Sequence, residues 1–137
     1  MATTAMTYPM PDDILSALLE LARQEKGGNS ALVFRGHDED LQNVFYKLGQ
    51  KYRSALLNTF VFSNSGPRPY SPILSDSVSK LQLAGLIGRQ NPDYEFIFTT
   101  PATADYYQVV LSKRFTEDQK NELREIAHGL LELVHTV

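Results

Sequence analysis

The sequence has no cysteine and no tryptophan among its 137 residues. Without cysteine the chain forms no disulfide bond, no thiolate metal site and no thiol nucleophile, and this composition fits a reducing compartment. No apolar run approaches the roughly 20 residues that cross a bilayer. The first ten residues also lack a basic segment followed by an apolar one, as a secretion signal would have. We therefore expect a soluble, cytoplasmic protein.

Positive charge is scarce as well. Thirteen Lys and Arg stand against sixteen Asp and Glu, which gives a net charge of −3 and a pI near 5.5. Proteins that coat nucleic acid or anionic membranes by bulk charge need clustered cations, so the composition argues against both and leaves room only for a local basic patch. The length and the 42% apolar content suit a single domain with one hydrophobic core.

The rest of the chain is organised around residues 66–99. Ser71 is a natural N-cap and Pro72 suits the first helical position, while Ala84-Gly85 provides a stop. Between them, apolar residues recur at helical spacing. The two short apolar segments at 86–87 and 96–99 flank a turn-rich stretch and predict a hairpin. A helix followed by such a hairpin is typical of the second half of a winged-helix unit.

Helical periodicity and capping signals predict five helices in all. The last is the best marked, because Thr116 and Gln119 have capping-box spacing. We expect residues 1–10 to form a flexible end, and the last two helices to form a C-terminal helical hairpin over residues 102–134. The predicted helices span about 11–26, 39–52, 72–84, 102–111 and 117–134.

Three segments, near 58–63, 86–88 and 95–99, are predicted to form the sheet. Phe60 and Phe62 alternate in the first of them, which indicates an extended segment with one buried face. Residues 31–34 are a short apolar run that suits a strand or a helical turn, and we interpret them as a strand. The predicted fold is α+β, a winged-helix-like single domain over residues 11–137 with about five helices and a small antiparallel sheet and wing.

Features between residues 41 and 87 resemble one protein group. The first is the helical segment Leu41-Gln42-Asn43-Val44-Phe45-Tyr46-Lys47-Leu48, and the second is the extended segment Phe60-Val61-Phe62. A Gly66-Pro67 turn follows and leads through Pro69-Tyr70-Ser71 into a helix. That helix ends with Leu81-Gln82-Leu83-Ala84-Gly85-Leu86-Ile87. Together they resemble the Panacea group of SocA-like antitoxins and proteolysis adaptors, over about a third of the chain. The resemblance implies a winged-helix-like fold and binding to other proteins, often toxins.

The chain departs from that group at two places. The group usually carries a lysine where Asn43 stands. Its Gly-Pro pair usually runs directly into the aromatic residue, whereas Arg68-Pro69 intervenes here. The resemblance carries over no catalytic residue.

A protein-binding surface is the leading functional hypothesis. Arg68 and Tyr70 before the central helix, with Tyr94 in the wing, are of the residue types enriched at interface hot spots. Tyr70 could equally pack beneath the wing. The closing helix, with Leu133 beside its apolar stripe, could cover a second subunit as a homodimer or simply its own core.

DNA binding is the alternative, because winged-helix units commonly place the second helix in the major groove. The outward face of that helix is nearly neutral, and residues 66–99 hold equal numbers of basic and acidic side chains. Phosphate binding favours an excess of cations. The cations on residues 47–53 could join Arg68 and Arg89 as a patch, or form a solvated helix face. The candidate DNA contacts are Lys47, Lys51, Arg53, Ser75, Ser79, Lys80 and Arg89.

No metal, cofactor or catalytic site is expected. Residues 37–40, His-Asp-Glu-Asp, have suitable ligand types, but acids at a helix start favour the positive end of the helix dipole. His128 and His135 lie two helical turns apart, too far to share a metal. Neither a G-x-S-x-G turn nor a phosphate-binding glycine loop is present. We expect a non-enzymatic regulatory protein, with an enzyme built from distant residues as the third hypothesis.

Overall fold

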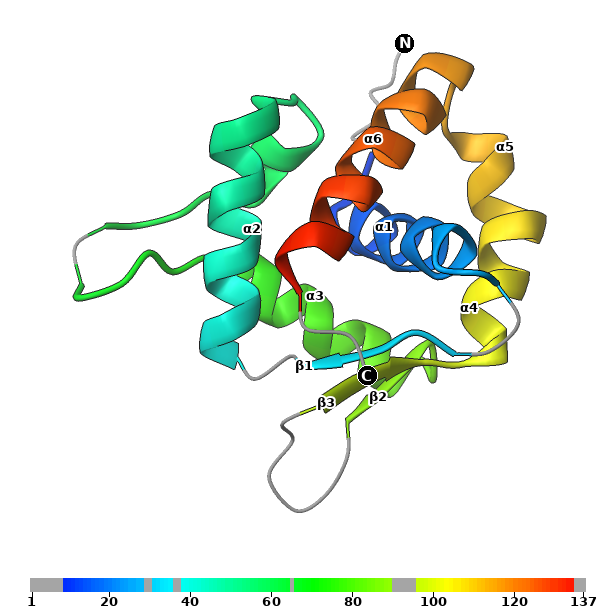
Figure 1. Cartoon of the computed structure of the whole chain (residues 1–137), viewed down its shortest axis with the longest axis horizontal. Coiled ribbons are helices and arrows are strands. Elements are labelled where there is room, and N and C mark those ends of the chain that lie inside the picture. The colour runs from blue at the N-terminus through cyan, green and yellow to red at the C-terminus, as the bar shows by residue number, and fades with distance from the viewer. Residues whose placement is uncertain (1–8, 29–30, 36–37, 65, 90–95, 135–137) are drawn as a thin grey trace, which may run out of the picture.

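The computed structural model describes residues 9–28, 31–35, 38–64, 66–89 and 96–134. It is a single small α+β domain in which a small antiparallel sheet lies at one edge of the helices (Figure 1), and this confirms the predicted α+β class. The helices and strands, in chain order, are α1 Pro11–Glu25, β1 Val33–Arg35, α2 Asp38–Tyr52, η2 Leu57–Thr59, α3 Pro72–Leu83, β2 Ile87–Arg89, β3 Phe96–Thr99, α4 Pro101–Tyr106, η3 Tyr107–Leu111, α5 Ser112–Arg114 and α6 Glu117–Leu133.

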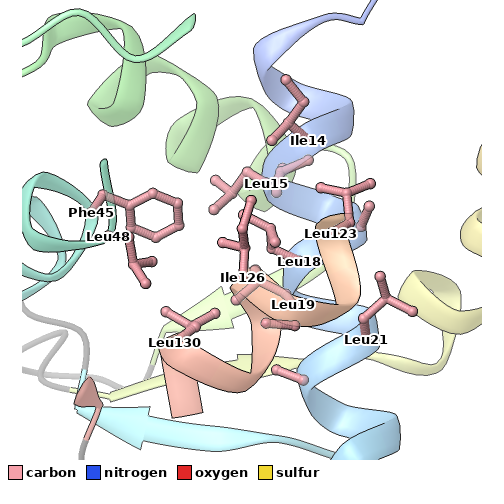
Figure 2. Close-up of a cluster of buried hydrophobic side chains, with 14 of the residues drawn as sticks. Ile14, Leu15, Leu18, Leu19, Leu21, Phe45, Leu48, Leu123, Ile126 and Leu130 are labelled. Atoms are coloured by element: carbon pink, nitrogen blue, oxygen red, sulfur yellow. The ribbon is translucent and has the colours of Figure 1, made fainter. Parts of the chain in front are cut away.

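The core is built around α1. This helix is buried continuously from Asp13 to Ala22, and it packs chiefly against α6 and α3. Figure 2 shows its apolar side chains meeting those of α6 and α2 in one cluster. The labelled members are Ile14, Leu15, Leu18, Leu19 and Leu21 from α1, Phe45 and Leu48 from α2, and Leu123, Ile126 and Leu130 from α6.

Four predicted helices correspond to α1, α2, α3 and α6 within about three residues. The predicted caps are also present. Ser71 Oγ accepts from Leu74 N at 3.2 Å, and Thr116 and Gln119 bond reciprocally at the start of α6. The predicted helix at 102–111 is instead part of a longer helical stretch, α4 to α5, whose middle five residues are π-helical. No helix in the described part of the chain is long and apolar enough to cross a bilayer.

The sheet has the order β1-β3-β2, with both pairings antiparallel. The strand interpretation of residues 31–34 is confirmed in part, because β1 begins at Val33 and its Phe34 lies opposite Ile97 of β3. The side chain of Thr99 extends this pairing, since its Oγ1 accepts from the backbone N–H of Leu32 at 2.9 Å.

The predicted strand at residues 58–63 is wrong. Residues 57–59 form the short helix η2, and only Ser63 makes a bridge, with Tyr70. The rings of Phe60 and Phe62 pack against α2 instead of lying in the sheet. Phe60 packs edge-on against Phe45 with ring centroids 5.5 Å apart. Because β1 and β2 already flank β3, the central strand has no free edge for this segment.

A glycine sets the fit between α2 and α6. Gly129 lies inside the C-terminal half of α6, and a Cβ added there would meet the Tyr52 hydroxyl at 2.5 Å. Glycine inside a helix costs about 1 kcal/mol relative to alanine. The close approach of the tyrosine ring explains why glycine stands at this position.

We predict that Gly129→Ala destabilises the protein by about 1–3 kcal/mol, because overpacking outweighs the gain in helix propensity. Gly49→Ala is the matched control. Gly49 lies within α2 and has open space around its Cβ position, so this variant should be up to about 1 kcal/mol more stable. Urea denaturation of both variants measures the free energy of unfolding. Equal effects of the two substitutions would contradict the assigned role of Tyr52.

Candidate functional site

The segment between η2 and α3 projects from the body of the molecule beyond α2 (Figure 1). We call residues 61–71 the projecting loop. Its two arms are joined by a pair of backbone hydrogen bonds between Ser63 and Tyr70, at 2.8 and 3.0 Å. Side chains alternate along extended arms, so one face turns inward and the other outward. Val61 and Tyr70 lie on the outward face and are 63% and 47% exposed.

Two contacts hold the loop to α2. On the inward face, Phe62 packs against Tyr46 with ring centroids 5.5 Å apart. At the end of the loop, the side-chain amide of Gln42, only 4% exposed, pairs with the backbone of Ser71. Gln42 Oε1 accepts from Ser71 N at 2.7 Å, and Gln42 Nε2 donates to Ser71 O at 3.0 Å. The amide therefore bonds the chain as a neighbouring strand would.

Gln42 was not singled out in the sequence. The sequence offers one sign of its role: Gln42 lies next to the apolar stripe of its helix. An amide buried at such a position requires hydrogen-bond partners. Its Nε2 also donates to Ser75 Oγ at 3.0 Å. Ser75 was predicted to face outward as a DNA contact, and the structure instead places it half-buried beneath the loop's attachment to α2.

The predicted partner-binding residues are only partly brought together. Tyr70 is exposed, so the alternative that it packs beneath the wing is wrong. Arg68 is also exposed and lies two residues away on the same loop. Tyr94 lies outside the described residues. The exposed Ile73, in the first turn of α3, follows the loop directly and adds a further apolar side chain.

The residues predicted to contact DNA lie on different elements, and two of their lysines contact acidic side chains. Lys80 pairs with Asp76 one turn away on α3, at 3.0 Å, and Ser79 beside it is exposed. Lys51 is 3.4 Å from Glu132 of α6, a contact that raises the pKa of the lysine. The other three are exposed Lys47 on α2, exposed Arg53 just after α2 and half-buried Arg89 on β2.

Among the candidate metal ligands, His37 and His135 lie outside the described residues, and Asp38 to Asp40 begin α2 as predicted. His128 lies between two carboxylates: Nδ1 bonds Glu25 Oε2, and Nε2 is 3.6 Å from Glu132 Oε2. The bond to Glu25 raises the pKa of His128. No group of three or more His, Cys, Asp or Glu in the described part of the chain could hold a metal ion.

The buried carboxylates have structural partners. Asp13 on α1 accepts from Tyr106 Oη at 2.7 Å and from Arg114 Nη1 at 3.1 Å, which joins α1 to α4 and α5. Burial, together with the bond to Asp13, raises the pKa of Tyr106 to about 12. Glu20 accepts from Nε and Nη2 of Arg23, at 2.8 and 2.7 Å. These pairs connect and neutralise buried charges, as a stable interior requires.

Comparisons with models of protein families, with curated proteins and with solved structures found no match for this chain. The functional argument therefore depends on the geometry described above.

We predict that Gln42→Ala destabilises the protein by about 2–3 kcal/mol, because it leaves the buried N–H of Ser71 without its acceptor and leaves the Ser71 carbonyl with only its bond from Ser75 N. Gln50→Ala, at an exposed position of the same helix, should change stability by less than about 0.5 kcal/mol. Chemical denaturation gives both values. Amide hydrogen exchange at Ser71 should become faster in the Gln42 variant alone, and unchanged exchange would contradict the proposed attachment of the loop.

The Glu25 contact predicts a pH dependence. Because the pKa of His128 is raised in the folded protein, its stabilising contribution is complete below the unfolded value near 6.5 and is lost as pH rises through the folded value. An NMR titration of His128 should show a higher pKa than 6.5, and Glu25→Gln should lower it. Glu125→Gln, an exposed control on α6, should leave it nearer the wild-type value; equal effects would reject the pairing with Glu25.

Proposed function

We propose that the protein is a non-enzymatic regulatory or adaptor protein that binds another protein through the projecting loop. The observation that carries the proposal is the exposure of Val61 and Tyr70 on a backbone that is held in place by the Ser63 bridge and the Gln42 amide. A surface ordered before binding loses less conformational entropy when its partner arrives. Tyrosine and arginine are also the residue types that contribute most at protein interfaces.

The order of the elements supports the same proposal. Helix, strand, two helices and a hairpin follow one another, and the sheet order β1-β3-β2 places β1 beside the second hairpin strand. We infer a winged-helix-like unit in which α3 is the second helix and β2 and β3 flank the wing. This inference agrees with the resemblance to SocA-like antitoxins and adaptors, in which the bound partner is often a toxin. We further propose that the protein acts in the cytoplasm, since it has no cysteine.

DNA binding is the second candidate, favoured by the same element order. The outward side of α3 weighs against it, because its cation Lys80 is paired with Asp76 and no further Lys or Arg lies on that helix. A DNA-binding helix would need cations that are available to phosphates. Protein binding therefore remains the leading proposal, and catalysis ranks third.

We predict that the double variant Arg68→Ala, Tyr70→Ala weakens partner capture by about thirtyfold or more, the effect of removing an interface hot spot. Val109→Ala is the matched control, because Val109 is 64% exposed on the distant η3 segment. The partner is first isolated by affinity purification from the source cells, and the dissociation constants of the purified pair are then measured. Wild-type affinity in a correctly folded double variant would reject this surface.

A further inference from the structure

The two arms of the projecting loop differ at their outer edges. Ser63 and Tyr70 exchange both backbone hydrogen bonds, so the backbone groups of their neighbours point to the outer edges of the two arms. On the second arm these neighbours are Pro69, which has no N–H, and Ser71, whose N–H and C=O pair with the Gln42 amide. The second arm therefore offers no N–H to a further strand.

The outer edge of the first arm is open. The neighbours of Ser63 on this arm are Phe62 and Asn64, and no hydrogen bond joins the backbone of either to any residue in the described part of the chain. Their N–H and C=O groups face away from the second arm. The Phe62 ring lies on the inward face, against Tyr46, so it does not cover this edge. Figure 1 shows the arm projecting beyond α2.

This open edge lacks the usual protection against pairing. Free edges in natural sheets commonly carry lysine, proline or a bulge that keeps other strands away. Residues 54–64 contain no charged residue and no proline, whereas the second arm has Pro67, Arg68 and Pro69. Phenylalanine and valine, which occupy residues 60–62, also favour strands. The contrast between the two arms indicates that the first arm is available to a further strand.

The backbone groups of Phe62 and Asn64 define what can occupy the edge. A helix cannot pair with them, because its own N–H and C=O groups are bonded internally, whereas an extended segment can. The edge carries no charge, so charge complementarity favours an uncharged segment. A second copy paired through residues 61–64 would contribute only about four residues, far fewer than the roughly 20–30 on each side of a stable interface.

We propose that the partner bound by the projecting loop adds an extended, uncharged segment to the first arm as a further strand. The backbone of this segment pairs with Phe62 and Asn64. Its alternate side chains lie beside Val61, which is 63% exposed on the outward face, and Tyr70 follows on the same face of the second arm. This inference rests on the proposed function and specifies how the partner binds.

The test uses NMR of the full chain with a short peptide of alternating Thr and Val residues, blocked at both ends, as the probe. At saturation the peptide should slow amide hydrogen exchange of Phe62 and Asn64 by about tenfold or more, because these N–H groups gain acceptors. Exchange of Ser63 and Tyr70 should change less, since their N–H groups are already bonded.

N-methylated peptides test the backbone pairing itself. If the Val side chains lie beside Val61, the Thr residues are those whose N–H groups face the edge. A peptide N-methylated at each Thr should therefore bind about tenfold more weakly than the parent peptide. A peptide N-methylated at each Val should bind nearly as the parent does.

One variant and a matched control locate the binding. Val61→Lys places a charge beside the open edge and should weaken peptide binding by about tenfold. Val109→Lys is the control, because Val109 is 64% exposed on η3, and this variant should bind as the wild type does. Both substitutions are at exposed positions, so loss of the fold is not expected, and circular dichroism checks it.

Three results would overturn the added-strand inference. The first is unchanged exchange of Phe62 and Asn64 with the peptide, and the second is equal weakening by the two N-methylated peptides. The third is self-association of the chain, measured by sedimentation velocity, that Val61→Lys abolishes, since the occupant would then be a second copy.

The capture experiment with Arg68→Ala, Tyr70→Ala separates this inference from the proposed function. If the double variant loses its protein partner while the peptide fails to protect the edge, only the mode of binding is wrong. If capture by the double variant is also unaffected, the proposed function is wrong as well.

Discussion

Burial of α1 on all sides is the constraint on which the rest of this structure depends. A helix surrounded by protein is usually apolar all round, yet α1 buries Asp13 and Glu20 together with its leucines. A buried carboxylate needs a partner, so Arg23 covers Glu20 while Tyr106 and Arg114 come to Asp13. The apolar side of α1 meets α3 and α6, and Asp13 joins α1 to the α4–α5 stretch, while the Glu20–Arg23 pair lies within α1 itself. The placement of the C-terminal helices follows from both sets of contacts.

The projecting loop depends on this core through α2. Phe45 and Leu48 attach α2 to the cluster around α1 and α6, while Gln42 and Tyr46 on the same helix attach the loop. The loop is therefore positioned by a helix that is itself fixed in the core. This arrangement presents Val61 and Tyr70 to solvent at a defined place, which an unattached loop of the same sequence would not do. A surface held at a fixed place suits the partner recognition proposed for this loop.

Whether a predicted contact residue is available for binding depends on residues far from it in the sequence. Arg68 and Tyr70 were predicted as interface residues because their types and their position before a helix can be read locally, with burial of Tyr70 beneath the wing as the alternative. The structure leaves both side chains exposed, and their interface role stays a prediction. The basic residues were less well predicted. Lys51 and Lys80 look equally available in the sequence, but each lies next to an acid in the structure, Glu132 from another helix and Asp76 from its own. Gln42 looked like a neutral helix residue, because its partner Ser71 is 29 residues away.

The sequence by itself determined the helices and their starts. The caps at Ser71 and Thr116 act within three residues, so the hydrogen bonds that form them are already encoded locally. Only the tertiary structure decided which segment completes the sheet. Residues 31–35 and residues 58–63 both have short apolar patterns, and their strand propensity cannot say which lies beside β3. The choice was made by packing: Phe60 and Phe62 bury their rings against α2, whereas β1 pairs with β3 and buries Phe34.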